Sequence, residues 1–418
     1  MSLGASSGPS ARTADLAPSS PVEFNPLLPE FIANPYPFYR RLQTEDPVHR
    51  STLLPDSWIL TRYADAAMVL RDPRFGRQDA ARFFQERFGD GPVVDVYTKW
   101  MLFRDPPDHT RLRTLVSKAF TPRAIENLRP RIQVLVDQLL DTVQGGGKMD
   151  IMDIMDTIAY PLPVLVICEM LGVPAKDRDI FQAWSGDVAR TLDPIQTPET
   201  VERGHAVVAR MCDYFRELIA ELRHAPKDNL LSAMIVAEEQ GDRLTEEELL
   251  ANCILLFSAG HETTVNLIGN GMLALLRHPD ERKKLEERPE LIESAVEEFL
   301  RYEGPVQLTG RGTSQDVEIG GKRIKAGERM FTIVAAANRD PAQFPNPDRL
   351  DITRHENRHL AFGYGIHFCL GAALARLEAQ SAIGTMLRRM PRLALQTDTV
   401  QWRPAFTLRG LQALPVTF

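Results

Sequence analysis

Hydrophobic residues recur at helical spacing along most of this chain, and their pattern predicts a protein built mainly of helices. From about residue 106 to residue 302 nearly every segment has this period, interrupted by short runs rich in Gly, Pro and polar residues. The longest segment begins at a capping-box pattern, Thr245 with Glu248, and continues to Arg277. Because this segment is apolar almost all round, we expect one long helix buried through the centre of the fold.

Patterns typical of strands are confined to the two ends of the chain. Residues 48–63 predict two strands around a Pro-Asp-Ser turn, residues 316–324 a hairpin with Gly-Gly at its tip, and residues 327–338 one more strand. A short helix is expected over residues 34–47, and a long irregular loop rich in aromatic residues over 72–105. The fold is therefore expected to be mainly α with a small β region.

The chain is expected to be a single domain preceded by a tail. Residues 1–23 are rich in Ser, Pro, Ala and Gly, a composition typical of disorder. Residues 24–418 contain no internal repeat and no convincing linker, so we expect them to fold together. Within them, residues 338–358 are rich in Pro, Asp and Asn and predict coil.

Charge and cysteine usage exclude several classes of protein. The formal net charge is −7 over 418 residues, so the chain lacks the basic character of nucleic-acid-binding proteins. No apolar run approaches the roughly 18–20 residues of a membrane span, and the first residues lack the apolar core of a signal peptide. The four cysteines are widely spaced without a CxxC pair, which excludes a zinc ribbon and indicates a reducing compartment. We therefore expect a cytoplasmic protein with neither nucleic-acid nor membrane partners.

One cysteine stands at a chemically unusual place. Cys369, in HLAFGYGIHFCLGAALARLEAQ (residues 359–380), follows a loop of glycines and aromatics and precedes a segment of strong helical period. Backbone N–H groups and the positive end of the helix dipole favour a thiolate at such a position. Gly363, Gly365 and Gly371 indicate backbone that bends sharply or lies against something flat. The alternative is a small buried hydrophobic side chain.

Polar residues occupy the centre of the long buried helix, in SAGHETT (residues 258–264). Glu262 and the hydroxyls of Thr263 and Thr264 need partners there, because unpaired polar groups are costly to bury. With Gly260 they predict a polar notch beside whatever the helix crosses; the alternative is that a distant Arg pairs with Glu262. HETTV lacks the second His of a zinc-protease motif, and GNGMLA lies inside a helix, so neither a zinc site nor a dinucleotide site is expected.

Glu298 and Arg301 form a charged pair with i, i+3 spacing on one helix face. Such pairs are common on surfaces, and the chain contains a second copy of the spacing in Glu126 and Arg129. The spacing alone is therefore weak evidence for a special role.

Four further cations are candidates for binding an anionic ligand. Each alone is typical of a solvated surface, but together they would neutralise two carboxylates. They are His109, Arg113, Arg311 and His367.

Three motifs in this order resemble those of the cytochrome P-450 proteins. FGYGIHFCLG is similar to their heme loop, AGHETT to the acid-alcohol motif of their central helix, and ExxR falls between the two. The similarity extends from about residue 24 to residue 418 and is greatest to soluble bacterial members, including those that tailor polyketides and other secondary metabolites. It implies the cytochrome P-450 fold, with the long central helix lying over heme b.

The resemblance implies a heme-thiolate monooxygenase. Cys369 matches the axial ligand of the heme iron, and a thiolate there favours cleavage of the O–O bond. Glu262 and Thr263 match the pair that delivers protons, and their presence favours O₂ over peroxide as the oxidant. Electrons are expected to come ultimately from NAD(P)H through an external ferredoxin or flavodoxin, because the chain has no fused reductase.

The same resemblance assigns structural and heme-binding roles. Glu298 and Arg301 match a pair that ties its helix to the NPDRL coil, with Arg349 as the expected contact. The positions matching propionate ligands are His109, Arg113, Arg311 and His367, and those shaping the thiolate pocket are Phe362 and Gly365.

A redox partner is expected on the Cys369 side, where Arg376, Arg71 and Arg111 form a candidate basic patch. The substrate is expected to be a hydrophobic small molecule (a polyketide or macrolide, terpenoid, steroid or fatty acid) that is hydroxylated or epoxidised. The candidate substrate contacts are Phe83, Phe84, Val94, Leu255, Ala259, Val306, Gln307 and Phe406. Two alternatives stay open: a thiolate-heme peroxygenase or isomerase, and a non-catalytic heme-binding sensor.

Overall fold

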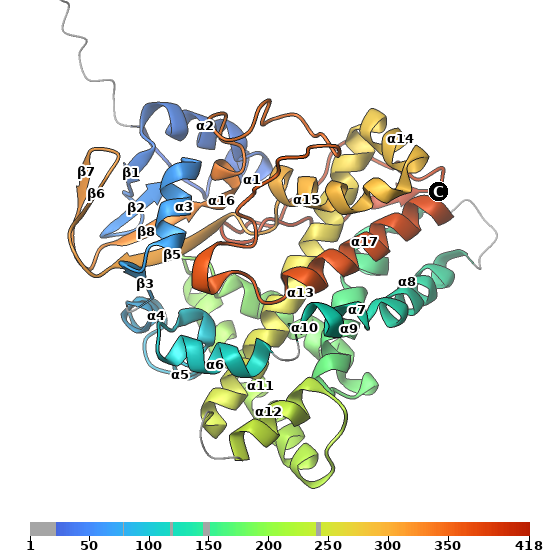
Figure 1. Ribbon diagram of the computed structural model, residues 1–418, viewed down its shortest axis with the longest axis horizontal. Coiled ribbons are helices and arrows are strands. Elements are labelled where there is room, and N and C mark those ends of the chain that lie inside the picture. Colours follow the sequence, from blue (N-terminus) through green and yellow to red (C-terminus); the bar gives the residue numbers. More distant parts are fainter. Residues whose placement is uncertain (1–21, 78, 118–119, 145–150, 240–243) are drawn as a thin grey trace, which may run out of the picture.

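The computed structural model describes residues 22–77, 79–117, 120–144, 151–239 and 244–418 (Figure 1). Val22 is already buried, in the same hydrophobic cluster as Phe24. Residues 22 and 23, which the sequence assigns to the tail, therefore belong to the folded chain. The apolar Val22 side chain is buried because it packs against the hydrophobic cluster that contains Phe24. The rest of the expected tail, residues 1–21, lies outside the described residues.

Most of the chain is helical, as the hydrophobic period predicts. Figure 1 shows the labelled strands on one side of the molecule and the C-terminus on the opposite side, with helices between them. The helices are α1 (Pro29–Ala33), α2 (Tyr36–Glu45), α3 (Tyr63–Arg71), α4 (Ala80–Phe88), α5 (Pro92–Tyr97), α6 (Asp108–Ser117), α7 (Pro122–Glu126), α8 (Arg129–Gln144), α9 (Pro161–Leu171), α10 (Arg178–Arg190), α11 (Pro198–His224), α12 (Leu230–Glu239), α13 (Glu246–Arg277), α14 (Pro279–Glu287), α15 (Ile292–Tyr302), α16 (Val334–Ala337) and α17 (Ala372–Arg389).

Helix α13 is the predicted long central helix, and it crosses the molecule (Figure 1). It has 32 residues and begins after Thr245, where Thr245 and Glu248 form both hydrogen bonds of a capping box. Its side chains are buried along nearly the whole length, because α9, α10, α11, α15 and α17 pack around it. Within the described ranges, no helix combines the length and the apolar character that crossing a membrane requires.

The main sheet joins the N-terminal strands to residues 308–333. Its strand order is β1-β2-β8-β5-β3, in which β2 and β8 are parallel and the other neighbours antiparallel. The strands are β1 (Val48–Arg50), β2 (Ser57–Leu60), β3 (Phe75–Gly76), β5 (Leu308–Thr313) and β8 (Arg329–Ile333). The two strands predicted over residues 48–63 are thus confirmed.

Two smaller sheets complete the β region. The predicted hairpin is confirmed as β6 (Val317–Ile319) and β7 (Lys322–Ile324), with Gly320 and Gly321 at φ +56° and +74° in its turn. The third sheet has the order β4-β10-β9, formed by β4 (Ile151–Asp153), β10 (Pro415–Thr417) and β9 (Ala394–Leu395). It fixes the C-terminus against the middle of the chain.

The aromatic segment 72–105 is not the irregular loop that its composition predicts. It contains β3, α4, α5 and a 3-10 turn at Met101–Phe103. Phe84 and Phe88, four residues apart, give α4 one buried apolar face, which packs on α5. The aromatic residues therefore form a core, because their helical spacing outweighs the Gly and Asp residues between them.

The strand predicted over residues 327–338 ends early. Strand β8 stops at Ile333, and Val334–Ala337 form the short helix α16. Three successive alanines favour a helix over a strand, and the Asn338 amide closes the turn on the Val334 carbonyl at 2.9 Å. The chain then leaves the sheet and forms the predicted coil up to the Cys369 loop.

Candidate active site

The loop before α17 holds Cys369 by a tight backbone fold. The Cys369 amide donates to the Phe362 carbonyl at 2.9 Å. Gly365 has φ +72°, and a Cβ there would lie 2.7 Å from the Leu70 carbonyl oxygen, so any other residue would displace the loop. Gly371 has φ −84° and no protein atom near its Cβ position, so no contact within the described chain requires glycine there.

Cys369 lies two residues before the N-cap of α17. The Cys369 side chain has accessible surface, yet many protein atoms lie close around it. Both are expected of a side chain that faces a space inside the protein. Burial raises the pKa of the thiol, while the Gly371 N–H and the guanidinium groups of Arg113 and Arg376 act in the opposite direction. The N–H at the helix end thus acts in the direction that the sequence predicts, against the effect of burial. Coordination to a metal ion deprotonates a thiol outright. Cys369 is available for such coordination, because it is accessible and forms no disulfide.

A short face of α13 is accessible in the middle of an otherwise buried helix. The accessible residues are Ala259, Gly260 and Thr263, and the Thr263 hydroxyl donates to the Ala259 carbonyl at 2.7 Å. Glu262, the neighbouring residue, is buried. Since other helices enclose α13, accessible surface at its centre means that it borders a space inside the protein. The polar notch at Gly260 stays a prediction. The alternative, a distant arginine paired with Glu262, is present: the Arg403 guanidinium contacts Glu262 Oε1.

A group of cations gathers where β3 pairs with β5. Arg77 and Arg311 both donate to the Thr309 hydroxyl, at 3.2 and 3.3 Å. The rings of His109 and His367 lie 4.3 Å apart. Across the described ranges, none of these four cations forms an ion pair with a carboxylate.

These four buried basic side chains have no carboxylate in contact with them among the described residues, although Asp105 acts on Arg77 and Arg311 from further away. Burial lowers the pKa of Arg311 to about 10, and burial with neighbouring cations lowers the pKa of Arg77 and His367 well below their ordinary values. Arg77 Nε, His109 Nδ1 and His367 Nε2 are buried without a hydrogen-bond partner in the described part of the chain. Because buried charges are stable only when paired, this group fits a ligand with two carboxylates, which heme b carries as propionates.

Helix α15 contains a fully buried ion pair. Arg301 donates to both carboxylate oxygens of Glu298, at 2.8 and 2.7 Å, and neither side chain is accessible. Arg354 and Asn357 each donate to Glu298 Oε2 at 3.1 Å. Arg349 participates only through its backbone carbonyl, which accepts from Arg301 at 3.1 Å. The predicted contact with Arg349 is therefore present and is made through its backbone, while the coil side chains that reach Glu298 are those of Arg354 and Asn357.

Comparison with known proteins decides the family. Residues 56–406 match the family model for cytochrome P-450. This chain belongs to the cytochrome P-450 family. It is accordingly a cytochrome P-450 monooxygenase with a heme-iron cofactor, and its mainly helical, single-domain fold is the expected one.

Similar proteins cover almost the whole chain. The biotin biosynthesis cytochrome P-450 of Bacillus subtilis (strain 168) is 44% identical, over 93% of this chain and 97% of the relative. The vitamin D(3) 25-hydroxylase of Pseudonocardia autotrophica is 47% identical, over 93% and 94%. The crystal structure of a cytochrome P-450, BioI, in complex with acyl carrier protein ligated with hexadec-9Z-enoic acid has a TM-score of 0.84 and 43% identity, over 93% and 99%.

Sequence reasoning missed Arg77. The available signal was a basic residue directly after the strand-like Phe75 and Gly76, but nothing local distinguishes it from a surface arginine. Only the pairing of β3 with β5 brings it beside Arg311 in this cytochrome P-450. Arg113, which was predicted, also donates to the Phe368 carbonyl at 2.6 Å and so ties α6 to the Cys369 loop.

Two of the three arginines predicted for partner docking are engaged in ion pairs. Arg376 forms a bidentate pair with Glu297, at 2.6 and 2.8 Å. Arg111 pairs in the same way with Glu248, at 2.9 and 2.6 Å. Arg71 forms no ion pair with any carboxylate in the described part of the chain, so it alone of the three offers an uncompensated charge.

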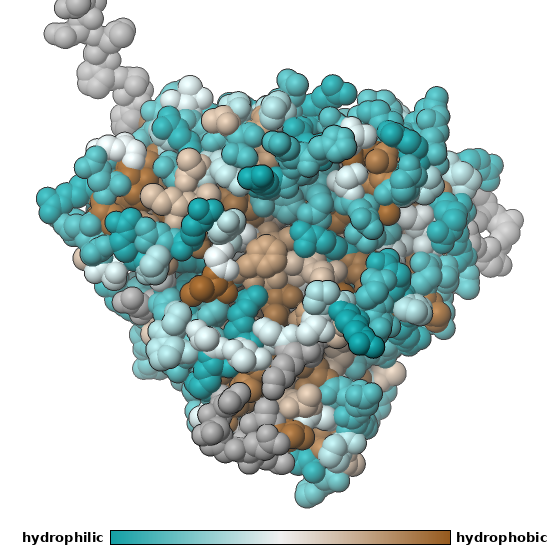
Figure 2. Space-filling model, viewed as in Figure 1, coloured by the Kyte–Doolittle hydropathy of each residue, from teal (hydrophilic) through white to brown (hydrophobic). Residues whose placement is uncertain are grey.

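Exposed hydrophobic side chains surround Arg71. Tyr364, Ile366 and Phe368, all in the loop before Cys369, are 40%, 54% and 42% exposed. The Arg71 guanidinium lies 4.6 Å from the Tyr364 ring centroid and donates to its hydroxyl at 2.9 Å. Figure 2 shows hydrophobic residues exposed in the middle of the face on which this loop lies. This surface is suited to contact another protein.

The predicted substrate contacts divide into three groups. Ala259 faces the accessible space at the centre of α13. Gln307 is instead engaged within the protein, donating to the Gly304 carbonyl at 2.9 Å and accepting from the Tyr39 hydroxyl at 3.2 Å. The remaining six are packed in hydrophobic clusters or half-buried: Phe83, Phe84, Val94, Leu255, Val306 and Phe406.

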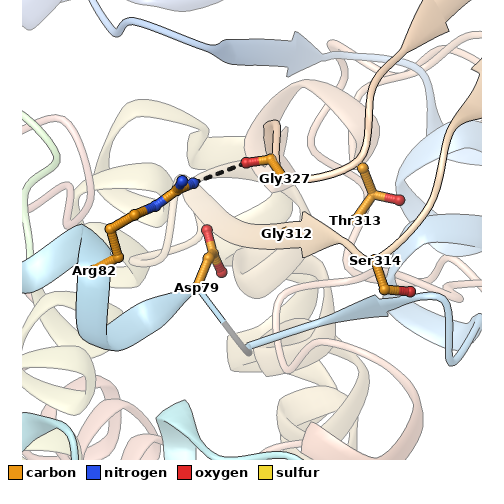
Figure 3. A pocket seen from close by; sticks show the side chains of 6 residues that line it. All are labelled: Asp79, Arg82, Gly312, Thr313, Ser314 and Gly327. Atoms are coloured by element: carbon orange, nitrogen blue, oxygen red, sulfur yellow. Dashed lines mark hydrogen bonds between the residues drawn. The ribbon is translucent and has the colours of Figure 1, made fainter.

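A separate hollow of about 350 Å³ lies at the edge of the main sheet (Figure 3). Its lining residues are Asp79, Arg82, Gly312, Thr313, Ser314 and Gly327. Arg82 donates across it to the Gly327 carbonyl at 3.0 Å. None of the lining residues belongs to α13 or to the loop before α17, so this hollow is not the heme site.

Proposed function

We propose that this cytochrome P-450 uses O₂, with electrons from NAD(P)H delivered by an external ferredoxin or flavodoxin, to hydroxylate or epoxidise a hydrophobic small molecule. Cys369 and the cationic group would hold heme b, which supplies O–O bond cleavage when a thiolate is its ligand. The observation that carries the proposal is the accessible Thr263 hydroxyl next to the buried Glu262 on α13.

Glu262 and Thr263 are the residues that handle protons. Burial raises the pKa of Glu262 to about 7, where a carboxyl both takes up and releases a proton near neutral pH. The Thr263 hydroxyl donates to the Ala259 carbonyl. The Thr263 hydroxyl oxygen can still accept a hydrogen bond from a molecule in the accessible space beside α13. Protons passed along this pair are consumed when one oxygen atom of O₂ leaves as water.

A long hydrophobic substrate is supported by the relatives and by the site. Among the candidate contacts, Ala259 is the one with accessible surface at the centre of α13, and it is apolar. One relative is named for vitamin D(3), and the other protein is bound to acyl carrier protein carrying hexadec-9Z-enoic acid. Both are extended hydrophobic molecules, and we propose the same class here.

Thr263→Ala is expected to separate O₂ consumption from product formation. The experiment reconstitutes the protein with a surrogate ferredoxin and reductase, with vitamin D(3) and hexadec-9-enoic acid as first probes. Product per O₂ consumed is expected to fall about tenfold or more, with H₂O₂ released instead, because positioned proton donors contribute roughly 10²–10⁴ in rate. Thr264→Ala is the control, since it removes the neighbouring hydroxyl, which is buried.

The same assay distinguishes the alternatives. Turnover with peroxide alone that Thr263→Ala leaves unchanged would identify a peroxygenase or an isomerase. A protein whose heme spin state responds to none of the probes, and which consumes no O₂ with the surrogate partners, would be a heme sensor.

We also propose that an acidic redox partner docks on the surface formed by Tyr364, Ile366 and Phe368. Arg71 and Arg358 supply the charge, because both are exposed and neither pairs with a carboxylate of the described residues. The charges of both arginines lower the pKa of the same residue, Tyr63, so the two arginines lie on the same side of this surface. An apolar centre flanked by unpaired cations is complementary to a small acidic protein.

Ile366→Glu and Arg71→Glu are each expected to slow reduction of the heme iron by reduced ferredoxin about tenfold at low ionic strength, because like charges repel during encounter. Stopped-flow absorbance measures this rate, and the difference should shrink as salt is added. Arg323→Glu, an exposed arginine on the β6–β7 hairpin, is the matched control. Equal reduction rates in all variants would place the partner elsewhere.

A further inference from the structure

Helix α15 carries two successive acids that face different partners. Glu298 belongs to the buried network with Arg301, whereas Glu297 pairs with Arg376 of α17. Arg376 donates to both carboxylate oxygens of Glu297, at 2.6 and 2.8 Å. The two side chains are 28% and 31% accessible, so both are half-buried. Helices α15 and α17 are thus joined by a second ion pair, separate from the Glu298 network.

His359 completes this second group as a neutral ring. Its Nδ1 accepts from the Ala361 amide at 3.2 Å, so the ring proton is on Nε2, which lies 3.2 Å from Glu297 Oε2. Burial raises the pKa of Glu297, but the hydrogen bonds from Arg376 and His359 outweigh burial and lower that pKa to about 2. Near neutral pH the group therefore holds one positive and one negative charge, and it is neutral as a whole.

The positive end of this group lies close to Cys369. The Arg376 guanidinium is 4.5 Å from the centroid of the Phe362 ring, and Phe362 is the residue whose carbonyl accepts the Cys369 amide at 2.9 Å. The Arg376 charge acts on Cys369 as well, where it favours the thiolate by lowering the pKa of the thiol against the effect of burial. Because an aromatic ring lies against the guanidinium, water screens this charge less than at an open surface.

Arg113 of α6 acts on Cys369 in the same direction. Arg113 donates to the Phe368 carbonyl and forms no ion pair with a carboxylate of the described residues, whereas Arg376 is paired with Glu297. Of the two cations, Arg376 is therefore the one whose effect on Cys369 depends on a neighbouring acid. Removing Glu297 would expose Cys369 to the whole Arg376 charge.

We propose that Glu297 and Arg376 are positioning residues that balance the charge beside the Cys369 thiolate, and that they thereby set the reduction potential of the heme iron. The proposal rests on the proposed function, because it requires heme held by Cys369. One-electron reduction makes the heme and its thiolate ligand more negative by one charge. A nearby positive charge favours this change and a negative charge opposes it, so groups outside the ligand shell tune the potential.

The test measures the reduction potential by spectroelectrochemistry near pH 8, where an ordinary carboxyl is ionised and an ordinary imidazole is neutral. Glu297→Gln leaves the Arg376 charge unbalanced and is expected to favour the ferrous form about tenfold, which is about 59 mV for one electron. Arg376→Met leaves the Glu297 charge unbalanced and is expected to shift the equilibrium about as far in the opposite direction. The double variant carries neither charge and is expected to return to the parent potential.

A matched control pair joins α8 to α9. Arg131 donates to both carboxylate oxygens of Glu169, at 2.9 and 2.5 Å, and Arg178 is a third partner at 3.1 Å. The Glu169 side chain is 28% accessible, the same value as for Glu297. Glu169→Gln therefore breaks a pair of the same geometry and exposure, and it is expected to leave the potential unchanged.

The sign of the two shifts separates an electrostatic role from a structural one. Opposite shifts in Glu297→Gln and Arg376→Met, cancelled in the double variant, would support the proposal. Shifts of the same sign, or none, would overturn it and leave the pair a structural link between α15 and α17. If Arg376→Met loses its heme, comparing Glu297→Gln with the double variant gives the same contrast, because these two differ only in the Arg376 side chain. The potential is measured without substrate, O₂ or ferredoxin, so a failure of the proposed oxygenation is a separate result.

Discussion

Cys369→His is expected to move the absorption band of the reduced, CO-bound heme from the position typical of a thiolate ligand to the shorter wavelength typical of an imidazole ligand. The loop that carries Cys369 is fixed by the Phe362 carbonyl and by the approach of Gly365 to Leu70, so the substituted side chain still faces the same space. Monooxygenase activity is expected to be lost with the band, because the thiolate is what favours O–O cleavage.

The measurement is a pair of reduced, CO-bound spectra on purified parent and variant. Cys212→Ala is the matched control, because Cys212 is a thiol buried in a hydrophobic cluster to which Cys369 does not belong, so its loss should leave the spectrum unchanged. A long-wavelength band that persists in Cys369→His would show that another residue is the ligand. A parent protein that binds no heme would remove the basis of every role given to the site.

Glu298→Gln is expected to be among the most destabilising single changes in the molecule. It leaves the guanidinium groups of Arg301 and Arg354 without their carboxylate in a region where the pair is fully inaccessible. Removing one partner of a buried ion pair costs about 3–5 kcal/mol of folding free energy. We expect a lower denaturation midpoint by circular dichroism and a lower heme content per polypeptide, since this network holds the coil that leads to the Cys369 loop.

A matched control for Glu298 is built into the chain. Glu126 and Arg129 have the same i, i+3 spacing and the same bidentate contacts, at 2.5 and 3.0 Å, but their side chains are 61% and 47% exposed. Glu126→Gln is therefore expected to have little effect on the midpoint, because water screens exposed pairs. Equal destabilisation by the two changes would mean that burial is not what makes the Glu298 pair important.

Local patterns were sufficient for the regular elements. The capping box at Thr245 and the apolar period after it located α13 to the residue, and the Gly-Gly turn located the β6–β7 hairpin. Local patterns failed in two short segments. Within residues 72–105, the aromatic residues of α4 pack against α5, so both helices form, and α16 forms at the point where β8 leaves its sheet partners.

The chemistry of the site was visible in the sequence wherever it depends on neighbours along the chain. Each of three groups is local in the chain: Cys369 with its loop, Glu262 with Thr263, and Glu298 with Arg301. Their spacing made them candidates, and the family resemblance gave them roles. The cations His109, Arg113, Arg311 and His367 come from separate segments, and their proposed common purpose depended on the family resemblance.

Only the tertiary structure decided which distant residues complete these groups. Arg77 joins the basic group through the β3–β5 pairing, the side chains of Arg354 and Asn357 reach Glu298 from the coil, and Arg403 reaches Glu262 from the C-terminal turn. It also showed that Arg376 and Arg111 are already neutralised. The physical reason is that periodicity and capping record interactions between residues close in the chain, whereas the partner of a buried charge is fixed by packing between elements far apart in it.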